Sequence, residues 1–489
     1  MDAGQQALES EQKEEQRLHS LGYEQELKRE FSFWHAAALG FADISPIVAL
    51  YGMFGLALAA AGPPFFWGLF LVLGGQMLVA LVFGEIASRW PLAGGVYQWT
   101  RQQVGNRWAW FAGWAYMWTL TIAMSTVAFA AATFTAAVIG IENPDKTTLI
   151  VGAFLFLAFG TLANTVGQWV LKVFVSLSIA AEFIASIIVG AVLLIFYQVN
   201  PIDILFDSHG ASGGAGGSEY LFFAWLGAVA FIGWSFLGFE ASGAIAEEVR
   251  GPERAVPWSI IVVLGFVGAV VIFTSLAILL AMPDINAAMT GGIADPVAQT
   301  MEYHFGPEIT KPLLALIALG FTASMVALQT AVSRTMFSFA RDKAIPFHEY
   351  FQHLSGDNKL PVRAIVFTGV IAAIFLVVNL GMEQIYTLLL SFVVGGFYIS
   401  FLFPVAAALY LHGVKRHQAG PFSLRRLSFV VTLIATIWLV FEFVNIAWPR
   451  YPELEWFENW GVILIVIILG VVGVIAYAIV PEKGTGEEI

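Results

Sequence analysis

Twelve apolar stretches dominate the chain, each long enough to cross a lipid bilayer. A hydrocarbon core about 30 Å thick needs about 20 apolar residues of α-helix. The sequence is 58% hydrophobic and only 12% charged, which excludes an ordinary soluble domain. We therefore predict transmembrane helices near residues 33–61, 65–88, 105–136, 148–167, 172–199, 220–249, 257–282, 312–340, 362–381, 384–412, 424–448 and 459–480.

The first and sixth spans each carry a helix-breaking sequence beside an acid. Asp43 and Pro46 stand near the centre of the first span, and the sixth contains a glycine-bounded stretch at 233–240 that ends in an acid. Proline lacks an amide proton and glycine weakens a helix, so both spans should be interrupted at membrane depth. Interrupted backbone persists there only where it lines a protein-enclosed cavity. Such breaks in matching positions of two halves are typical of a secondary transporter with a midplane binding site.

The breaks also predict how the single domain at 31–482 is organised. They give two sets of five spans and a final pair, at about 31–199, 220–412 and 424–481. Because five is odd, the two sets would insert with opposite polarity and form an inverted repeat. The expected fold class is thus an all-α membrane protein with twelve helices, of which helices 1 and 6 are broken.

The basic residues predict the orientation of the chain in the membrane. With the N-terminal end inside, 20 of the 23 lysines and arginines fall in inner loops, tails or helix ends, and only Lys146, Lys311 and Arg450 fall outside. Cytoplasmic segments carry such an excess of positive charge. We expect a multi-pass protein of the cell membrane, with cytoplasmic tails at 1–30 and 483–489. The first tail is too hydrophilic to be a signal peptide.

Several motifs occur in a fixed order along these spans. They lie at 31–34 (FSFW), 84–99 (GEIASRWPLAGGVYQW), 238–240 (GFE) with 246–257 (AEEVRGPERAVP), and 333–335 (SRT) with 340–346 (ARDKAIP). Together they resemble the amino acid–polyamine–organocation superfamily, and most closely its amino acid/choline branch. The resemblance implies a five-plus-five inverted repeat and alternating access, in which spans 1, 2, 6 and 7 rock against the rest.

The first span departs from the amino-acid members of that superfamily. Those members usually have a glycine-rich turn whose free amides receive the substrate carboxylate. Here Ile44, Ser45 and Pro46 replace that turn, and Pro46 removes an amide donor. This departure weakens an assignment to α-amino acids.

Asp43 precedes the replaced turn and is expected about 15 Å into the membrane, ten residues past Phe33. An ionised acid there costs at least about 2.5–3.5 kcal/mol and needs a partner. The sequence offers no lysine or arginine deep within a span. The partner is then a substrate cation, a coupling ion, a proton or the broken backbone; alternatively Asp43 merely caps the break.

Two further acids are candidates for ion coupling or gating. Glu182 shares one helix face with Ser178 and Ser186, and that polar stripe should face the protein interior. Because burial disfavours the charged form, Glu182 could carry a coupling proton; alternatively it is a protonated acid bonded to a neighbouring helix. Glu240 matches a family glutamate that helps to hold the broken helices and has been linked to proton coupling, which implies a structural or gating role.

Aromatic residues complete the expected substrate site. Trp234 and Phe236 follow Gly233 in the span-six break, and the superfamily places an aromatic gate at the position of Trp234. A desolvated aromatic face attracts an alkylammonium by about 2 kcal/mol or more; ordinary packing is the alternative. In span three the residues that could line the cavity are Tyr116, Met117 and Thr121.

Ser324 in span eight is the candidate for a sodium site. Sodium-coupled relatives of this architecture offer a hydroxyl there, and a carbonyl near Ile44 would complete the site. Serine in a membrane helix more often bonds its own backbone, so protons are favoured over sodium. The eight histidines are spread through the sequence and predict no metal site. No Walker A motif or nucleophile–histidine pair appears, so neither an ATP-driven pump nor an enzyme is expected.

The leading hypothesis is an ion-coupled importer of a small organic cation or amine, such as a choline-like, polyamine-like or alkylamine substrate. The runner-up is a permease for amino acids or GABA, in which helix N-termini would bind the carboxylate. A nutrient sensor or channel is disfavoured because no long soluble signalling domain is present. We expect no cofactor and no nucleic acid; the partners are the substrate, a coupling ion and membrane lipid.

Overall fold

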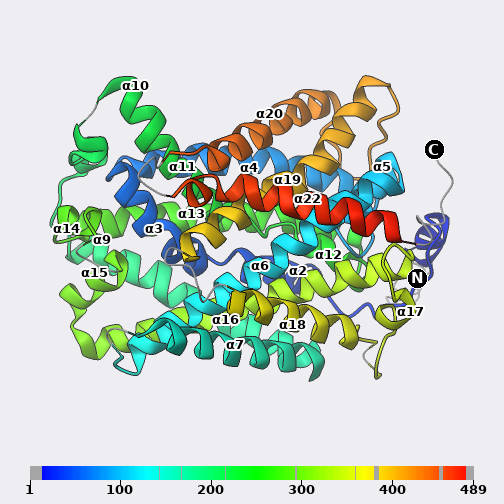
Figure 1. Ribbon diagram of the computed structural model, residues 1–489, viewed down its shortest axis with the longest axis horizontal. Helices are drawn as coiled ribbons and strands as arrows, with labels where there is room; N and C mark the ends of the chain where they lie inside the picture. The colour runs from blue at the N-terminus through cyan, green and yellow to red at the C-terminus, as the bar shows by residue number, and fades with distance from the viewer. Residues whose placement is uncertain are drawn as a thin grey trace, which may run out of the picture.

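The computed structural model describes residues 14–141, 144–166, 168–214, 216–291, 295–357, 359–378, 385–450 and 455–480. Within these residues the chain is helical, and two isolated β-bridges are the only pairing of extended backbone. Most helices run along the long axis of the molecule (Figure 1). Eleven helical segments are long and apolar enough to cross a membrane. The expected all-α membrane fold is therefore confirmed.

Eight of the spans are single helices. They are α4 (Phe65–Arg89), α6 (Asn106–Val138), α7 (Lys146–Val166), α13 (Pro252–Ala281), α16 (Pro307–Arg341), α19 (Ile385–Gly413), α20 (Ser428–Ala447) and α22 (Gly461–Ile479). The predicted ninth span is α18 (Val362–Val378), an apolar helix of only 17 residues. Residues 379–381 of its predicted range lie outside the described residues. With α18, every predicted span has a helical counterpart.

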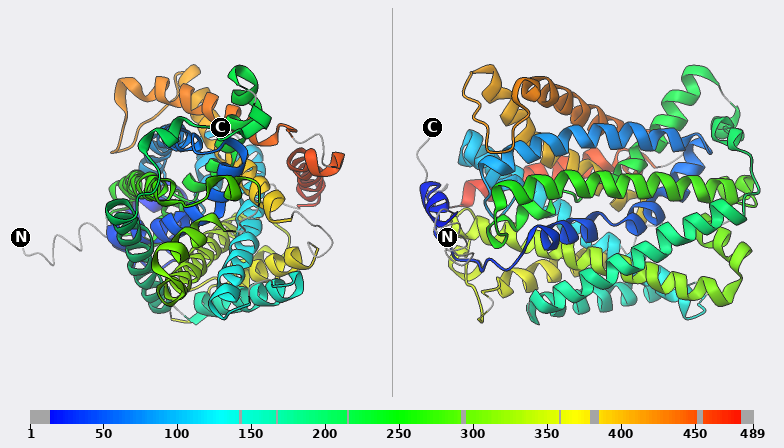
Figure 2. Two further views of the ribbon diagram at one scale, coloured as in Figure 1. Left: turned by 90° about the vertical axis from the view of Figure 1, so that its left-hand side faces the viewer. Right: turned by 180° about the vertical axis from the view of Figure 1, so that it is seen from behind.

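Short helices mark the two ends of the bundle. At one end lie α10 (Gly217–Glu219), α14 (Ile285–Met289) and α15 (Pro296–Phe305), and at the other lie α5 (Val96–Val104) and α17 (His348–Phe351) (Figure 1). The described chain begins at the second end, as the right-hand view of Figure 2 also shows from behind the molecule. Four other short elements lie in the connections between spans: α21 (Trp456–Asn459), η2 (Ile202–Phe206), η3 (Ala211–Gly214) and η8 (Arg425–Leu427).

Both predicted helix breaks are present. In the first span, α2 (Phe33–Ile44) and α3 (Pro46–Ala61) meet at Ser45, whose φ of 41° is uncommon for a residue other than glycine. Pro46 opens α3 at the first helical position, where an amide proton is not needed. The sixth span consists of η4 (Tyr220–Trp225), α11 (Leu226–Ile232), η5 (Gly233–Phe236), α12 (Ala241–Ala244) and η6 (Ala246–Glu248).

The fifth span is interrupted as well. It consists of α8 (Gln168–Glu182), the π-helical turn η1 (Phe183–Ile188) and α9 (Val189–Phe196). Ser178, Glu182 and Ser186 are all buried, so the polar stripe does face the protein interior. Single π-helical turns often occur at functional sites, and this one directly follows Glu182.

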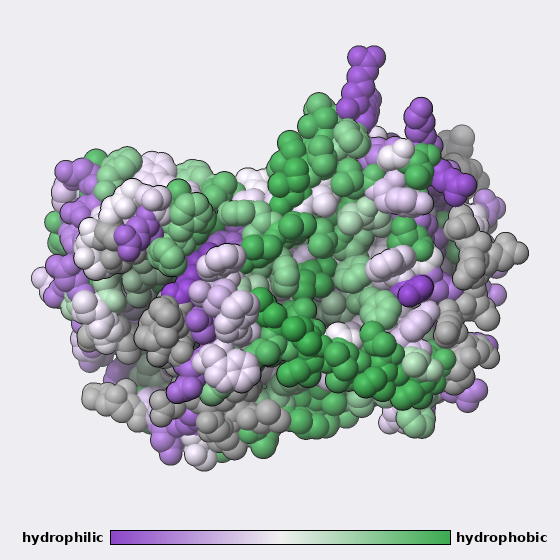
Figure 3. Space-filling view, turned by 45° about the horizontal axis from the view of Figure 1, so that its top comes forward, coloured by the Kyte–Doolittle hydropathy of each residue, from purple (hydrophilic) through white to green (hydrophobic). Residues whose placement is uncertain are grey.

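Apolar side chains form a broad exposed band around the middle of the molecule. Figure 3 shows hydrophobic residues gathered there, with hydrophilic residues toward the two ends. On α20 and α22 the exposed large apolar side chains include Leu433, Ile437, Phe441, Ile467, Val471 and Ile475. Such a band would be unfavourable in water and fits the hydrocarbon core of a bilayer.

Candidate functional site

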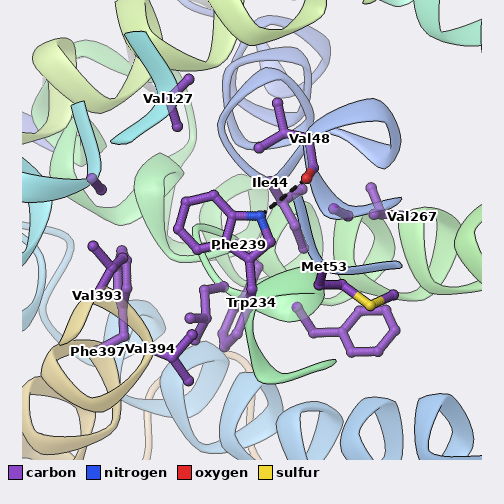
Figure 4. Packing of buried hydrophobic residues seen from close by; sticks show 14 of the residues in the cluster. Ile44, Val48, Met53, Val127, Trp234, Phe239, Val267, Val393, Val394 and Phe397 are labelled. Atoms are coloured by element: carbon purple, nitrogen blue, oxygen red, sulfur yellow. Dashed lines mark hydrogen bonds between the residues drawn. The ribbon is translucent and has the colours of Figure 1, made fainter. Parts of the chain in front are cut away.

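The two broken spans contact each other at their breaks. The indole Nε1 of Trp234 donates a hydrogen bond to the carbonyl oxygen of Val48 at 3.0 Å (Figure 4), and Ser235 Oγ donates to the carbonyl of Ala49 at 3.0 Å. A Cβ at Gly52 would lie only 2.5 Å from the indole nitrogen, so glycine permits this approach. The span-six break is therefore fixed to the first turns of α3.

Asp43 lies beside this junction with an unpartnered carboxylate. Its side chain is buried, and in the described part of the chain neither carboxylate oxygen has a hydrogen-bond partner. A Cβ at Gly238 would lie 2.8 Å from Asp43 Oδ2, and Gly238 has a φ of 94° that favours glycine. A buried, unpaired carboxylate is costly. This position is therefore suited to a cation or a proton.

A second acid lies close to Asp43. The hydroxyl of Tyr116 donates to Glu240 Oε1 at 2.9 Å, while Glu240 Oε2 is buried without a hydrogen-bond partner among the described residues. The carboxylates of Asp43 and Glu240 are near enough to repel each other when both are charged. We call these two residues the acid pair. No basic side chain among the described residues acts on either acid, so the pair can accommodate one positive charge or a proton.

Glu182 has entirely different surroundings. One carboxylate oxygen accepts the hydroxyl of Ser45, and the other accepts the backbone amide of Ile47 at 2.8 Å. The Ser45 Oγ in turn accepts the amide of Val48 at 3.1 Å, and Pro46 has no amide proton. The first amides of α3 are thus occupied by the chain's own side chains. A helix N-terminus favours an anionic group, and here the carboxyl group of Glu182 occupies that place.

The junction encloses a cavity of about 20 Å³. Its lining comprises Asp43, Ile44, Val48, Ala123, Val127, Trp234, Leu237, Gly238, Ser324, Leu328 and Phe397. A space of this size accommodates about one water molecule. The structure is therefore a closed conformation, and an organic ligand would enter only after the helices move.

Ion pairs close the molecule at the end that carries α5 and α17. Arg334 pairs with Glu248 at 2.9 Å, and Arg341 pairs with Glu247 at 2.8 Å. At the same end Phe31 exchanges backbone hydrogen bonds with the segment that follows η6, through the carbonyl of Glu248 and the amide of Arg250. The ion pairs tie the end of the sixth span to α16, and the backbone bonds tie the residue before the first span to the sixth. These contacts would have to separate if the cavity opened in that direction.

Some predicted site residues line the cavity and others do not. Asp43, Ile44, Trp234 and Ser324 line it. Ser45 and Gly233 stand at the breaks but outside the lining. Tyr116 is also outside the lining and reaches the site through its hydrogen bond to Glu240 and an edge contact with the ring of Phe397. Three further predicted residues do not line the closed cavity: Met117, Thr121 and Phe236.

Ser324 bonds to the helix break, not to its own helix. Its hydroxyl donates to the backbone carbonyl of Asp43 at 2.9 Å. The carbonyl at the C-terminal end of α2 is thus satisfied by α16. The expected alternative, a serine bonded back to its own chain, is not what the structure shows.

Apart from Ser324, sequence reasoning missed the cavity residues of unbroken spans. Ala123 and Val127 follow Tyr116 on one face of α6 at helical spacing, so extending that face by seven and eleven residues would have found them. Phe397 on α19 had no sequence signal, because it is one aromatic residue among many in an apolar helix. Figure 4 shows it on the opposite side of Trp234 from Val48.

Glu442 on α20 was also missed. It is completely buried, and it lies near the Tyr398 side chain. The hydroxyl of Tyr398 lies against the span-six break, since a Cβ at Gly233 would be 2.6 Å from it. An acid inside an apolar span was the available signal.

The prediction that the histidines lie apart was wrong for two of them. The rings of His412 and His417 stack with centroids 3.8 Å apart and planes inclined by 16°, and Glu85 lies beside them. The chain turns back directly after α19, and this turn places the ring of His417 against the ring of His412. Lone pairs lie in the ring planes, so two nearly parallel rings do not converge on one ion. Glu85 Oε1 already accepts from Ser423 and from the amide of Leu424, which satisfies that oxygen.

Comparison with known proteins gives one consistent family. A family profile described as amino acid permease matches residues 31–474. The amino-acid permease BAT1 of Arabidopsis thaliana is 25% identical over 470 residues, covering 89% of this chain and 89% of that protein. The choline transporter of Saccharomyces cerevisiae is 25% identical over 505 residues, covering 94% and 82%. A putative amino acid/polyamine transporter of Macrophomina phaseolina is 23% identical over 434 residues, covering 85% and 94%.

Proposed function

The chain belongs to the amino acid permease family of membrane transporters, and we propose that it imports a small organic cation or amine by alternating access. The substrate would be choline-like, polyamine-like or a simple alkylamine. Asp43 would bind its positive charge, and the face of Trp234 would cover it. The permease acts by transport and not as an enzyme.

The unpartnered carboxylate of Asp43 carries this proposal. In the closed structure it has no hydrogen-bond partner among the described residues, although it lies at the junction of both broken spans. The place that would receive a substrate carboxylate is filled, because Glu182 accepts the amide of Ile47. A cation therefore finds an acceptor at this site, while an α-carboxylate finds its donors already used.

An amino acid or GABA permease is the second candidate. It is supported by relatives that are named amino-acid permeases, including BAT1. The relatives named as a choline transporter and as a putative amino acid/polyamine transporter support the first candidate instead. An amino acid could bind only if opening of the cavity also displaced Glu182 from the N-terminus of α3.

We further propose that transport is coupled to protons, with Glu182 and Glu240 as the coupling or gating acids. Glu240 has one carboxylate oxygen free of hydrogen bonds in the described structure and lies beside Asp43, so a proton there would relieve the repulsion within the acid pair. Sodium coupling through Ser324 and a carbonyl of the break is the alternative. The proposed location is the cell membrane, with both termini in the cytoplasm.

A ligand-induced thermal-shift screen tests the substrate class. Purified permease is melted with choline, polyamines, alkylamines, GABA and α-amino acids, because a specific ligand stabilises the native state by mass action. We expect stabilisation by cationic amines that lack an α-carboxylate. Stabilisation by α-amino acids alone would refute the amine proposal and favour the second candidate.

Proteoliposomes test the coupling ion. Uptake of the stabilising ligand should increase with an inward pH gradient, and Glu240→Gln or Glu182→Gln should blunt that response. Strict sodium dependence with no response to the pH gradient would transfer coupling to the Ser324 site, whichever substrate is bound.

A further inference from the structure

A large groove lies at the end of the molecule that carries α5, well apart from the cavity between the breaks. Its volume is about 1380 Å³, and it is formed by the end of α4, by α5, by the start of α6, by the second half of α19 and by residues 415–418. Figure 1 shows α5 and the segment that joins α19 to α20 at this same end. The groove has two chemically different parts.

The first part is an apolar stripe on α19. Its members recur at intervals of three and four residues, which places them on one helix face. From residue 399 to residue 411 the stripe extends about 18 Å along the helix axis, at about 1.5 Å per residue. It consists of Ile399, Leu402, Phe403, Ala406, Ala407, Tyr410 and Leu411.

The second part is basic and lies at the end of the stripe. Arg89, Lys415 and Arg416 contribute positive charge to the lining, and His417 lies beside them. The lining contains no acidic residue, in a chain whose formal net charge is −12. Lys415 and Arg416 are exposed, and neither forms an ion pair within the described structure. These charges are therefore available to an anion.

We propose that this groove binds one anionic phospholipid, with its phosphate at Lys415, Arg416 and Arg89 and an acyl chain along the α19 stripe. A free phosphate would use the basic part and leave the apolar stripe uncovered. An acidic segment such as the tail at 481–489 would complement the charge but not the stripe. Only a lipid matches both parts. Trp108 and Tyr410, 55% and 61% exposed, flank the groove as aromatic residues do at a membrane interface.

Paired variants test the site without perturbing the substrate cavity. Lys415→Gln/Arg416→Gln removes two exposed charges from the groove. Arg425→Gln/Arg426→Gln removes two exposed charges from the nearby segment before α20, outside the groove, and is the matched control. Ala406→Trp fills the apolar stripe without a change of charge.

Binding of phosphatidylglycerol to the detergent-solubilised full chain is measured by native mass spectrometry. Phosphatidylcholine with the same acyl chains and glycerol phosphate serve as competitors. We expect one phosphatidylglycerol bound in preference to phosphatidylcholine. The groove double variant should weaken that binding about tenfold, since each basic residue near an anionic lipid contributes favourably. Ala406→Trp should also weaken it, and the control should not.

Several results would overturn the proposal. Equal binding of the two lipids, or undiminished binding by the groove double variant, would show that the basic part does not recognise the headgroup. Full competition by glycerol phosphate would identify a free anion as the ligand. If deletion of residues 481–489 were required before lipid bound, the tail would be the occupant. None of these outcomes depends on which substrate the permease carries.

Discussion

Asp43 and Glu182 flank the same helix break, but their carboxylates have opposite surroundings. Both oxygens of Glu182 accept hydrogen bonds from the start of α3, through Ser45 and Ile47. Neither oxygen of Asp43 has a partner in the described structure. Both side chains are buried, so exposure does not explain the difference.

The comparison separates an acid that stabilises the break from one that is free to bind. A buried carboxylate with two donors contributes to the folded state, whereas one without donors lowers stability until a cation or proton arrives. Two carboxyl groups beside the same helix break therefore serve two purposes. Which purpose applies depends on whether backbone amides point at the carboxylate.

Asp43→Asn should have the largest effect and act on binding. Asparagine keeps the shape and removes the charge, so amine affinity should fall about 100-fold, or about 3 kcal/mol. The unliganded variant should melt no lower than the parent, because an unpaired buried charge has been removed. Isothermal titration with the stabilising amine measures the affinity. Asp284→Asn, which changes an exposed helix cap on α14, is the control and should bind normally.

Glu182→Ala should act chiefly on stability. It leaves the amide of Ile47 and the hydroxyl of Ser45 without their acceptor, and the free energy of unfolding should fall by about 2 kcal/mol. Glu182→Gln retains one acceptor oxygen and should cost less. Melting of the unliganded protein in detergent provides the measurement. If Glu182→Ala abolished amine binding but left the melting temperature unchanged, the division of roles between the two acids would be wrong.

Gly238→Ala should disturb the side of the break that faces Asp43. Its φ of 94° is unfavourable for alanine, and the new Cβ would press on Asp43 Oδ2. We expect a loss of about 1–2 kcal/mol in stability and weaker amine binding. Gly74→Ala in α4, where a Cβ would have no neighbour within 4 Å, is the matched control and should be neutral or stabilising. Similar melting temperatures for the two variants would contradict the tight packing at Gly238.

The smallest expected effect is the difference in cation affinity between two variants of Trp234, Trp234→Phe and Trp234→Leu. Phenylalanine and leucine both lose the hydrogen bond to the Val48 carbonyl, so that common loss cancels when the two variants are compared. Only phenylalanine keeps an aromatic face, and a cationic substrate should therefore bind Trp234→Leu about 1 kcal/mol more weakly than Trp234→Phe. Equal affinities would indicate that packing, and not the ring face, covers the substrate.

Much of the fold could be predicted because its signals are local. Proline and glycine disfavour a continuous helix, and their placement beside an acid in the first and sixth spans predicted the breaks at Ser45 and after Gly233. Apolar length identifies the spans, and the helical spacing of Ser178, Glu182 and Ser186 indicates which face is buried. Asp43 could also be selected, because an acid at membrane depth is costly without a partner.

The pairing of side chains from distant segments was decided by the tertiary structure. Sequence alone does not reveal that Glu182 reaches Ile47 across 135 positions, or that Ser324 reaches the carbonyl of Asp43 across 281. It likewise hides Phe397 in the cavity and the stacked rings of His412 and His417. Helix periodicity gives the direction of a side chain on its own helix, but its neighbour depends on how the helices pack. That packing separates a carboxylate bonded to the chain from one left free for a ligand.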